Sequence, residues 1–510
     1  LDSIRYYFHL TPNKMLLLKV ASLLLLLTNL STGDDHIPLF INGRPKGGFM
    51  GTPKVKNQFL LNNIEPQWFT QKLNHFDDAD DSTWKQRYYV NDEYFDGGPV
   101  FLMIGGEGSL SSLWVNVGAM VDYAKQHSAL ILGLEHRFYG ESHPLSDMST
   151  ENLKYLSSEQ ALADLAHFRN EMALKYSLND KNRWIAFGGS YPGALAAWLR
   201  YKYQHLIYGA IASSAPIYAQ LNFPQYLEVS TNSLSSSRCR ANVNAATKIL
   251  ESYLTTEEGL MKLSKDFKTC KPITNDLRNI QNFANNAANN FFGVIQYNKD
   301  NREFEGAIGT NITIDVLCGI MTDTQLGDPY NRYVAVNSLI MNTYQQKCLD
   351  VSYEDYVESM KETDWGSSAG EGGRQWLYQT CTEFGYYQTT DSNKQVFGNM
   401  FPLDFFLKQC VDIFGDKFNE SSISQGINWS NTNYGGYKMN AKRIVFPNGS
   451  IDPWHALSFT KNEKDMISVF INGTAHCANM YPSSPDDSAE LIKARQFIGD
   501  LITKWLVTQE

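Results

Sequence analysis

Residues 183–200 read Arg183-Trp-Ile-Ala-Phe-Gly-Gly-Ser-Tyr-Pro-Gly-Ala-Leu-Ala-Ala-Trp-Leu-Arg200. The apolar run from Trp184 to Phe187 predicts a buried strand, and strong helix formers fill the second half of the stretch. Two glycines precede Ser190, and Pro192-Gly193 follow it closely. A chain that passes from strand to helix within a few residues adopts a strained turn and needs small neighbours. The pattern therefore predicts Ser190 at the apex of a strand-turn-helix unit.

Such a unit is typical of the nucleophile elbow of α/β-hydrolases. The spacing departs from the G-x-S-x-G form because Pro192 occupies the place of the second glycine and Gly193 follows it. An ordinary strand-to-helix turn is the alternative, so partners for Ser190 elsewhere in the chain must decide. A serine hydroxyl becomes a useful nucleophile only when an imidazole takes its proton and a carboxylate orients that imidazole.

Two later strand ends supply an acid and a base in the chain order that α/β-hydrolases use. One β-rich run leads into a turn-rich loop that contains Asp452, and the next leads into a loop that contains His476. Among the ten histidines only His455 and His476 follow this acid, and His455 lies on the same turn as Asp452. The sequence therefore predicts Ser190, Asp452 and His476 as a catalytic triad. A turn or helix-cap role is the alternative for Asp452.

A glycine-rich loop, Gly105-Gly-Glu-Gly108, follows the apolar run 99–104. We expect the backbone N–H groups of Tyr191 and Gly106 to form an oxyanion hole, which stabilises the negative charge on the attacked carbonyl oxygen. Glu107 is a candidate to receive a cationic substrate terminus. The alternatives are a plain β-to-α turn for the loop and a helix cap for Glu107.

Strands and helices alternate at both ends of the chain, which predicts a parallel sheet with helices on both faces. The expected strands lie within 67–90 and at 99–104, 129–134, 210–213, 443–446 and 466–471. The expected helices of this part lie near 113–126, from an N-cap at Ser158 to 168, and at 489–505. The intervening region has a different texture, with polar helical segments such as 241–254, 280–292 and 353–361.

The cysteines mark the same intervening region. Six of the seven lie within it, namely Cys239, Cys270, Cys318, Cys348, Cys381 and Cys410, and Cys477 lies apart from them. In an oxidising compartment an even set predicts disulfides, whose connectivity the spacing leaves open. We expect an α/β-hydrolase domain in two halves, 67–215 and 431–510, interrupted by a mostly helical, disulfide-stapled cap domain at 216–430.

The N-terminal region has the features of a secretory signal peptide. From Met15, a lysine, an apolar run and small residues match such a signal at 15–33, so that 1–14 is expected to be translated sequence upstream of the start. A membrane anchor is the alternative, but a span needs about 20 apolar residues. Residues 34–66 have weak periodicity and are interpreted as a loose lead-in or pro-segment. The mature chain is expected to be soluble, without a membrane partner, and secreted or lysosomal/endosomal.

The composition excludes several classes of protein. With 43% hydrophobic and 19% charged residues the chain is an ordinary globular protein, and a net charge of −10 without a basic stretch predicts no nucleic-acid partner. No C-x-x-C pair occurs, and no metal or cofactor is expected. Downstream of the predicted signal peptide, five N-x-[ST] sequons fit a secretory route and predict glycosylation at Asn311, Asn419, Asn428, Asn448 and Asn472.

Taken together, five stretches resemble the serine carboxypeptidase S28 family, which includes prolyl carboxypeptidase, dipeptidyl peptidase II and thymus-specific serine protease. These stretches are Gly188–Gly193, Glu135–Gly140, Glu159–Asp164, Asn448–Trp454 and Thr474–Cys477. The matches run from residue 67 to 500, and Trp376–Phe384 is most similar to the thymus-specific branch.

The resemblance implies a serine-type exopeptidase that acts on peptides through an acyl-enzyme on Ser190. Cleavage would follow proline or a small residue near a peptide terminus, and which terminus is read stays open. Trp454, with Tyr386, would line the apolar pocket for the proline ring. The implied disulfides are Cys239–Cys318, Cys270–Cys348 and Cys381–Cys410. A lipase or esterase on the same fold, or a non-catalytic binding protein, is the alternative. The oligomeric state is open, with a homodimer as one option.

Overall fold

An eight-stranded sheet carries the predicted elbow. The computed structural model describes residues 38–48, 51, 53, 55, 61–299 and 312–507. The strands of this sheet, in chain order, are β3 (Gln67–Lys72), β4 (Thr83–Asn91), β5 (Val100–Ile104), β6 (Leu130–Leu134), β7 (Trp184–Gly189), β8 (Gly209–Ser213), β11 (Ile444–Gly449) and β12 (Met466–Ile471). They lie in the order β12-β11-β8-β7-β5-β6-β4-β3. β4 is antiparallel to both of its neighbours, and all other neighbouring strands pair in parallel.

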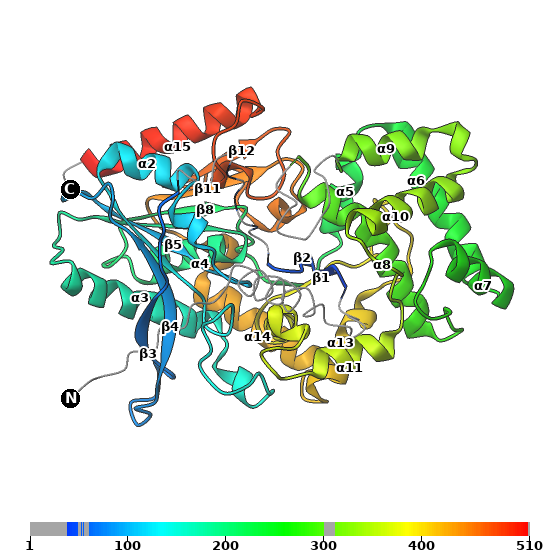
Figure 1. Cartoon of the computed structure of the whole chain (residues 1–510), viewed down its shortest axis with the longest axis horizontal. Helices are drawn as coiled ribbons and strands as arrows, with labels where there is room; N and C mark the ends of the chain where they lie inside the picture. The colour runs from blue at the N-terminus through cyan, green and yellow to red at the C-terminus, as the bar shows by residue number, and fades with distance from the viewer. Residues whose placement is uncertain are drawn as a thin grey trace, which may run out of the picture. The chain divides into compact units, whose positions relative to one another are not determined.

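Helices cover both faces of the sheet, as the alternating pattern predicted (Figure 1). They are α2 (Ala119–His127), α3 (Ser158–Lys175), α4 (Tyr191–Lys202) and α15 (Ala489–Val507). α2 and α15 share one apolar core with Phe101 and Met103, whereas α3 and α4 share the other with Leu102. Alternate residues of a strand point to opposite faces, so β5 contributes to both cores. The topology, the two helical layers and the strand-turn-helix unit at Ser190 are those of the α/β-hydrolase fold.

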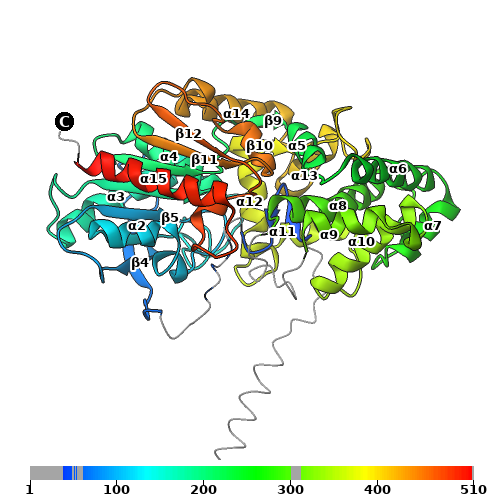
Figure 2. The ribbon, with the colours of Figure 1, turned by 90° about the horizontal axis from the view of Figure 1, so that it is seen from above.

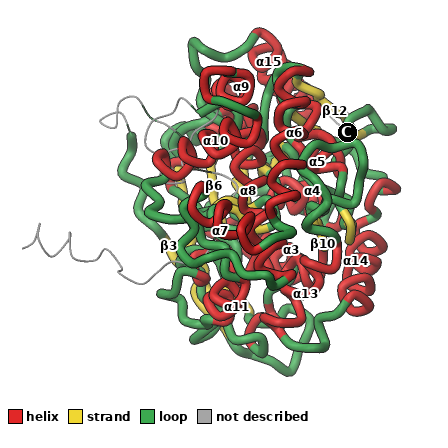
Figure 3. The backbone as a smooth tube through the Cα atoms, turned by 90° about the vertical axis from the view of Figure 1, so that its right-hand side faces the viewer, coloured by secondary structure: helices red, strands yellow, loops and turns green. Residues whose placement is uncertain are grey.

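The chain between β8 and β11 is mostly helical (Figure 3). Its helices are α5 (Gln225–Ser233), α6 (Ser237–Tyr253), α7 (Glu257–Asp266), α8 (Leu277–Gln296), α9 (Ile314–Thr322), α10 (Pro329–Thr343), α11 (Tyr353–Lys361), α12 (Gly373–Gln379), α13 (Leu403–Phe414) and α14 (Glu420–Tyr434). A short parallel pair, β9 (Gln220–Asn222) and β10 (Gly385–Tyr387), lies in the same region. Since α14 runs across residue 430, the division into 67–215, 216–430 and 431–510 stays a prediction.

Three disulfides join helices and turns of this region. They are Cys239–Cys318, Cys270–Cys348 and Cys381–Cys410, the pairs that the family resemblance implied. Cys477 is buried and forms no disulfide. Within the described residues, no helix combines the length and the apolar character that a membrane crossing needs.

Two local expectations were wrong. The helix expected near 113–126 is a 3-10 turn (Ser112–Val115) followed by α2, because Gly118 breaks it with a φ of 108°, a conformation that favours glycine. The N-cap of α3 is Ser157, whose side chain accepts the Gln160 backbone N–H, and Ser158 is the first residue of the helix.

Residues 38–48, which belong to the stretch interpreted as a lead-in or pro-segment, form a hairpin. β1 (Phe40–Ile41) and β2 (Arg44–Pro45) pair antiparallel, and Figure 2 shows them between the sheet and the helical region. Asn42 and Gly43 connect them with φ values of 47° and 74°, as a type I′ turn requires. Phe40 to Pro45 are all buried. The predicted signal peptide at 15–33 and residues 1–14 lie outside the described residues.

Candidate active site

Ser190 lies at a strained turn between β7 and α4. Its φ of 64° and ψ of −130° are uncommon for a residue with a side chain, and strain of this kind concentrates at functional sites. The neighbours must be small: a Cβ on Gly188 would overlap the Pro192 carbonyl, and one on Gly193 would lie 2.6 Å from Ser213 O. The Ser190 hydroxyl is buried and makes no hydrogen bond within the described part of the chain. This is the geometry of a nucleophile elbow.

Asp452 and His476 are hydrogen-bonded to each other. Asp452 follows β11, and its Oδ1 accepts the backbone N–H of Trp454 at 3.0 Å and the Nδ1–H of His476 at 2.9 Å. Both the acid and the imidazole are fully buried. A neutral imidazole that donates from Nδ1 carries its acceptor lone pair on Nε2, which is the form that a general base needs. The second histidine, His455, instead has its Nδ1 3.1 Å from the Gly449 carbonyl.

The loop after β8 ties the elbow to the histidine loop. The Ser213 carbonyl accepts the backbone N–H of Ser190 at 2.9 Å. The Ser214 hydroxyl accepts the backbone N–H of Cys477 at 2.9 Å, and Asn479 Nδ2 donates to Ser213 Oγ at 2.9 Å. The carboxyl ends of neighbouring parallel strands thus bring the three predicted triad residues into adjacent loops. Sequence reasoning missed Ser213 and Ser214, although two serines directly after an apolar strand were a usable signal.

The glycine-rich loop after β5 lies against the first turn of α4. A Cβ on Gly106 would overlap Pro192 Cγ, so the loop backbone approaches the turn that carries the Tyr191 N–H. The loop is anchored to the residue after β6, because the backbone N–H of Leu110 donates to Glu135 Oε1 at 3.0 Å. Burial raises the pKa of Glu135. The arrangement suits an oxyanion hole built from backbone N–H groups.

Buried side-chain bonds join residues of the sequence motifs, and one of these motifs contacts Tyr191 beside the elbow serine. Arg137 donates from Nε to Asp164 Oδ2 at 2.7 Å and from Nη2 to Oδ1 at 2.6 Å. Burial favours the protonated acid, but the charges and hydrogen bonds of Arg137 and His75 together outweigh it and lower the pKa of Asp164. The Tyr191 hydroxyl lies 3.0 Å from His136 Nε2 and accepts Gln379 Nε2–H at 3.1 Å. Burial lowers the pKa of His136 to about 4, so this imidazole is neutral at physiological pH.

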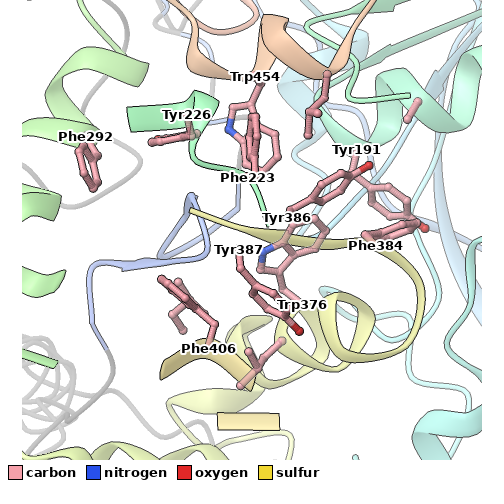
Figure 4. Packing of buried hydrophobic residues seen from close by; sticks show 14 of the residues in the cluster. Tyr191, Phe223, Tyr226, Phe292, Trp376, Phe384, Tyr386, Tyr387, Phe406 and Trp454 are labelled. Carbon is pink, nitrogen blue, oxygen red and sulfur yellow. The ribbon is translucent and has the colours of Figure 1, made fainter. Parts of the chain in front are cut away.

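Aromatic rings surround Trp454, the residue expected in the substrate pocket. The centroids of Phe223, Tyr226 and Tyr386 lie 5.7, 5.8 and 5.4 Å from its indole, and Figure 4 shows these rings close to it. The indole Nε1 donates to Gln296 Oε1 at 3.0 Å. The structure therefore brings Trp454 and Tyr386 together. It adds Phe223, Tyr226 and Gln296, which the sequence did not predict as neighbours of this indole.

Glu107 lies beside the N-terminal hairpin. It is buried, and its backbone carbonyl accepts Arg44 Nε–H at 2.6 Å. The sequence suggested that this carboxylate could receive a cationic substrate terminus, and it gave no sign that Arg44 lies beside it. Within the described ranges, no group of three or more His, Cys, Asp or Glu side chains is placed to hold a metal ion.

The predicted glycosylation sites differ in exposure. Asn419, Asn428 and Asn472 are exposed. Asn448 is fully buried, and its side-chain amide donates to the Phe459 carbonyl at 3.0 Å. A glycan there would require this amide to leave the core, so its burial argues against glycosylation of Asn448. Asn311 lies outside the described residues.

Comparisons with known proteins cover nearly the whole chain. The family profile described as serine carboxypeptidase S28 matches residues 71–498. A relative from Caenorhabditis elegans is 39% identical over 482 residues, 91% of this chain and 93% of that protein. Human thymus-specific serine protease is 35% identical over 453 residues, 86% of either chain. Human lysosomal Pro-X carboxypeptidase is 29% identical over 463 residues, 88% of this chain and 89% of that one. The profile match includes the elbow and the loops of Asp452 and His476.

Proposed function

The chain belongs to the serine carboxypeptidase S28 family and is a serine peptidase, and from this premise we propose that it is an exopeptidase that cleaves after proline or a small residue near a peptide terminus. The observation that carries the proposal is the buried bond between His476 Nδ1 and Asp452 Oδ1 in the loops beside the elbow serine. This bond leaves the imidazole in the tautomer that accepts a proton from a serine hydroxyl.

In the proposed mechanism Ser190 Oγ attacks the carbonyl carbon of the scissile bond, and its proton moves to His476 Nε2. Asp452 stabilises the imidazolium that forms. The N–H groups of Tyr191 and Gly106 stabilise the oxyanion. His476 then protonates the leaving amine, and an acyl-enzyme remains on Ser190. Water attacks the ester with His476 again taking the proton, which releases the acid and restores the hydroxyl.

The substrate preference rests on the pocket around Trp454. A flat indole walled by aromatic rings suits the rigid, apolar pyrrolidine of proline, and Tyr386 contributes to the same wall. One relative is named a Pro-X carboxypeptidase, which supports the same preference. Glu107 is proposed as a polar contact to the substrate because it lies in the loop that faces the elbow.

We also propose that the chain works in the secretory pathway, as a secreted or lysosomal enzyme. Its three disulfides are typical of oxidising compartments. One relative is named lysosomal.

The decisive experiment compares the wild type with Ser190→Ala on paired peptides. Peptides with proline or alanine near either end are incubated with the enzyme from pH 4 to 8, and the products are identified by mass spectrometry. We expect cleavage directly after proline near one terminus by the wild type and none by the variant. p-Nitrophenyl esters serve as the second substrate class. Turnover of esters without turnover of any peptide would contradict the proposal.

A further inference from the structure

The N-terminal hairpin, residues 38–48, contacts the proposed substrate pocket with its tip. A Cβ on Gly43 would overlap Gln388 Nε2 and would lie 2.7 Å from Cζ2 of Trp454, so the hairpin backbone lies directly against the indole. The Gly43 carbonyl accepts Gln296 Nε2–H at 3.0 Å, and the Oε1 of the same glutamine accepts the indole Nε1–H of Trp454. Trp454 is fully buried. The tip therefore covers one side of the Trp454 indole.

The base of the hairpin is fixed by an ion pair between the buried Arg44 and the partly exposed Glu371. The Arg44 guanidinium is shielded from solvent and donates to Glu371 Oε1 at 2.8 Å and Oε2 at 2.9 Å. Glu371 Oε2 also accepts the backbone N–H of Gly47 at 2.9 Å. The third Arg44 bond, from Nε to the Glu107 carbonyl, reaches the glycine-rich loop. A bidentate pair of this kind holds its partners in one orientation.

Close backbone approaches fit the hairpin to the helical region. A Cβ on Gly293 of α8 would overlap the ring of Phe40, and one on Gly372 would overlap the Arg44 guanidinium. On the other side, the Trp376 indole donates to the Asn42 carbonyl at 3.4 Å. Removing the hairpin would break the Arg44 ion pair and uncover Trp454. These contacts are those of a stably packed part of the fold rather than of a segment that dissociates.

We propose that the N-terminal hairpin is the end wall of the substrate groove on the acyl side of Ser190, so that only one or two residues fit before the scissile bond. This inference rests on the proposed function, in which the residue that acylates Ser190 puts its side chain against Trp454. The peptide backbone that precedes this residue must then pass the hairpin tip. There Gly43 has no room even for a methyl group, and the ion pair at Arg44 prevents the hairpin from moving away. The wall makes the enzyme read the amino terminus of a peptide.

The test uses peptidyl-proline diphenyl phosphonates, which react with the elbow serine whether or not peptides are cleaved. Ser190 Oγ bonds to phosphorus, phenol leaves with its oxygen, and the serine proton passes through His476 to the phenolate. One probe carries a single residue with a free amine before proline, and the other carries six residues. We expect the short probe to inactivate the wild type about tenfold faster or more, because the wall excludes the longer chain.

Two variants with matched controls test the wall itself. Arg44→Ala releases the base of the hairpin and should increase the rate of inactivation by the long probe alone. Arg278→Ala, which breaks the exposed ion pair with Asp404, is the matched control. Gly43→Ala pushes a methyl group into the pocket and should slow both probes about tenfold or more. Gly97→Ala is its control, since Gly97 has a similar φ of 70° and no atom within 4 Å of an added Cβ.

Three results would overturn the proposal. Equal rates of the two probes on the wild type would show that no wall exists. If Arg44→Ala increased the inactivation rates of both probes equally, the hairpin would be an inhibitory plug instead of a wall. If Gly43→Ala left both inactivation rates unchanged, the hairpin tip would not contact the bound probe. Probe selectivity in an enzyme that cleaves no peptide would support the wall while contradicting the proposed peptidase function. Peptide cleavage without length selectivity would contradict the wall alone.

Discussion

Replacing Asp452 by asparagine separates the charge of this side chain from its hydrogen bonds. In the structure both bonds converge on the same oxygen, Oδ1, from the Trp454 backbone N–H at 3.0 Å and from His476 Nδ1 at 2.9 Å. An asparagine amide oxygen in this position accepts both bonds. The imidazole should therefore keep its proton on Nδ1, and the variant should lose only the negative charge.

The expected loss follows from Coulomb's law. A carboxylate and an imidazolium whose charges are about 4 Å apart, at an effective dielectric constant of about 20, attract each other by about 4 kcal/mol. This attraction exists only after the imidazole has taken the serine proton, so its loss raises the activation barrier and lowers kcat by about 10³-fold. Asp452→Ala also loses the bond that orients the ring, and its kcat should fall by about a further tenfold.

The assay measures kcat and KM on an Xaa-Pro-aminomethylcoumarin, together with the rate of fluorophosphonate labelling of Ser190. KM should change little in Asp452→Asn, because the charge acts on the transition state and the apolar pocket is unaltered. In a triad whose asparagine forces the wrong tautomer, kcat falls by about 10⁴-fold. An Asp452→Asn enzyme no faster than Asp452→Ala would therefore refute the reasoning from a shared Oδ1.

Three further predictions concern other parts of the site. His476→Ala should lower kcat by about 10⁴-fold, while His455→Ala, in the turn after Asp452, retains near wild-type turnover. Steady-state kinetics of the two variants shows which histidine is the general base. Gly106→Ala should lower kcat by about 10²-fold with a smaller change in KM, because the added methyl group overlaps Pro192 and displaces an oxyanion donor. Burial raises the pKa of Glu383 to about 7 from 4.5, so the folded protein holds a proton that the unfolded chain releases. The stability that this proton gives is present below pH 4.5 and is lost as the pH rises to 7, which lowers the free energy of unfolding by about 3 kcal/mol. In urea unfolding, the free energy of unfolding of Glu383→Gln should therefore depend less on pH than that of the wild type.

The sheet and the predicted triad could be read from the sequence because their signals are local. The run Trp184 to Phe187 is apolar on both faces, as a strand buried between two helical layers must be. Ser190, Asp452 and His476 each lie in the loop or turn that follows such a run, and in a parallel sheet the carboxyl ends of the strands meet at one edge. Chain order and strand position were therefore enough to bring distant residues together.

The N-terminal hairpin could not be predicted in the same way. Asn42-Gly43 is a recognisable turn signal, but the two-residue strands beside it are too short for an alternating pattern. Two of the residues that order the hairpin, Trp454 and Glu371, lie more than 300 positions further along the chain. The burial of Asn448 could not be predicted for the same reason, since burial is decided by tertiary packing that a three-residue motif does not contain.

One residue of the helical region connects the parts of the site that sequence reasoning treated separately. Gln296, the last residue of α8, donates to the Gly43 carbonyl and accepts from the Trp454 indole, while its own carbonyl accepts the backbone N–H of His476 at 2.9 Å. Its side chain is fully buried, so these bonds have no competition from water. The hairpin wall, the apolar pocket and the histidine loop therefore share one support. A movement of α8 would change substrate fit and the position of the imidazole together, which makes the helical region part of the catalytic geometry and more than a cover over it.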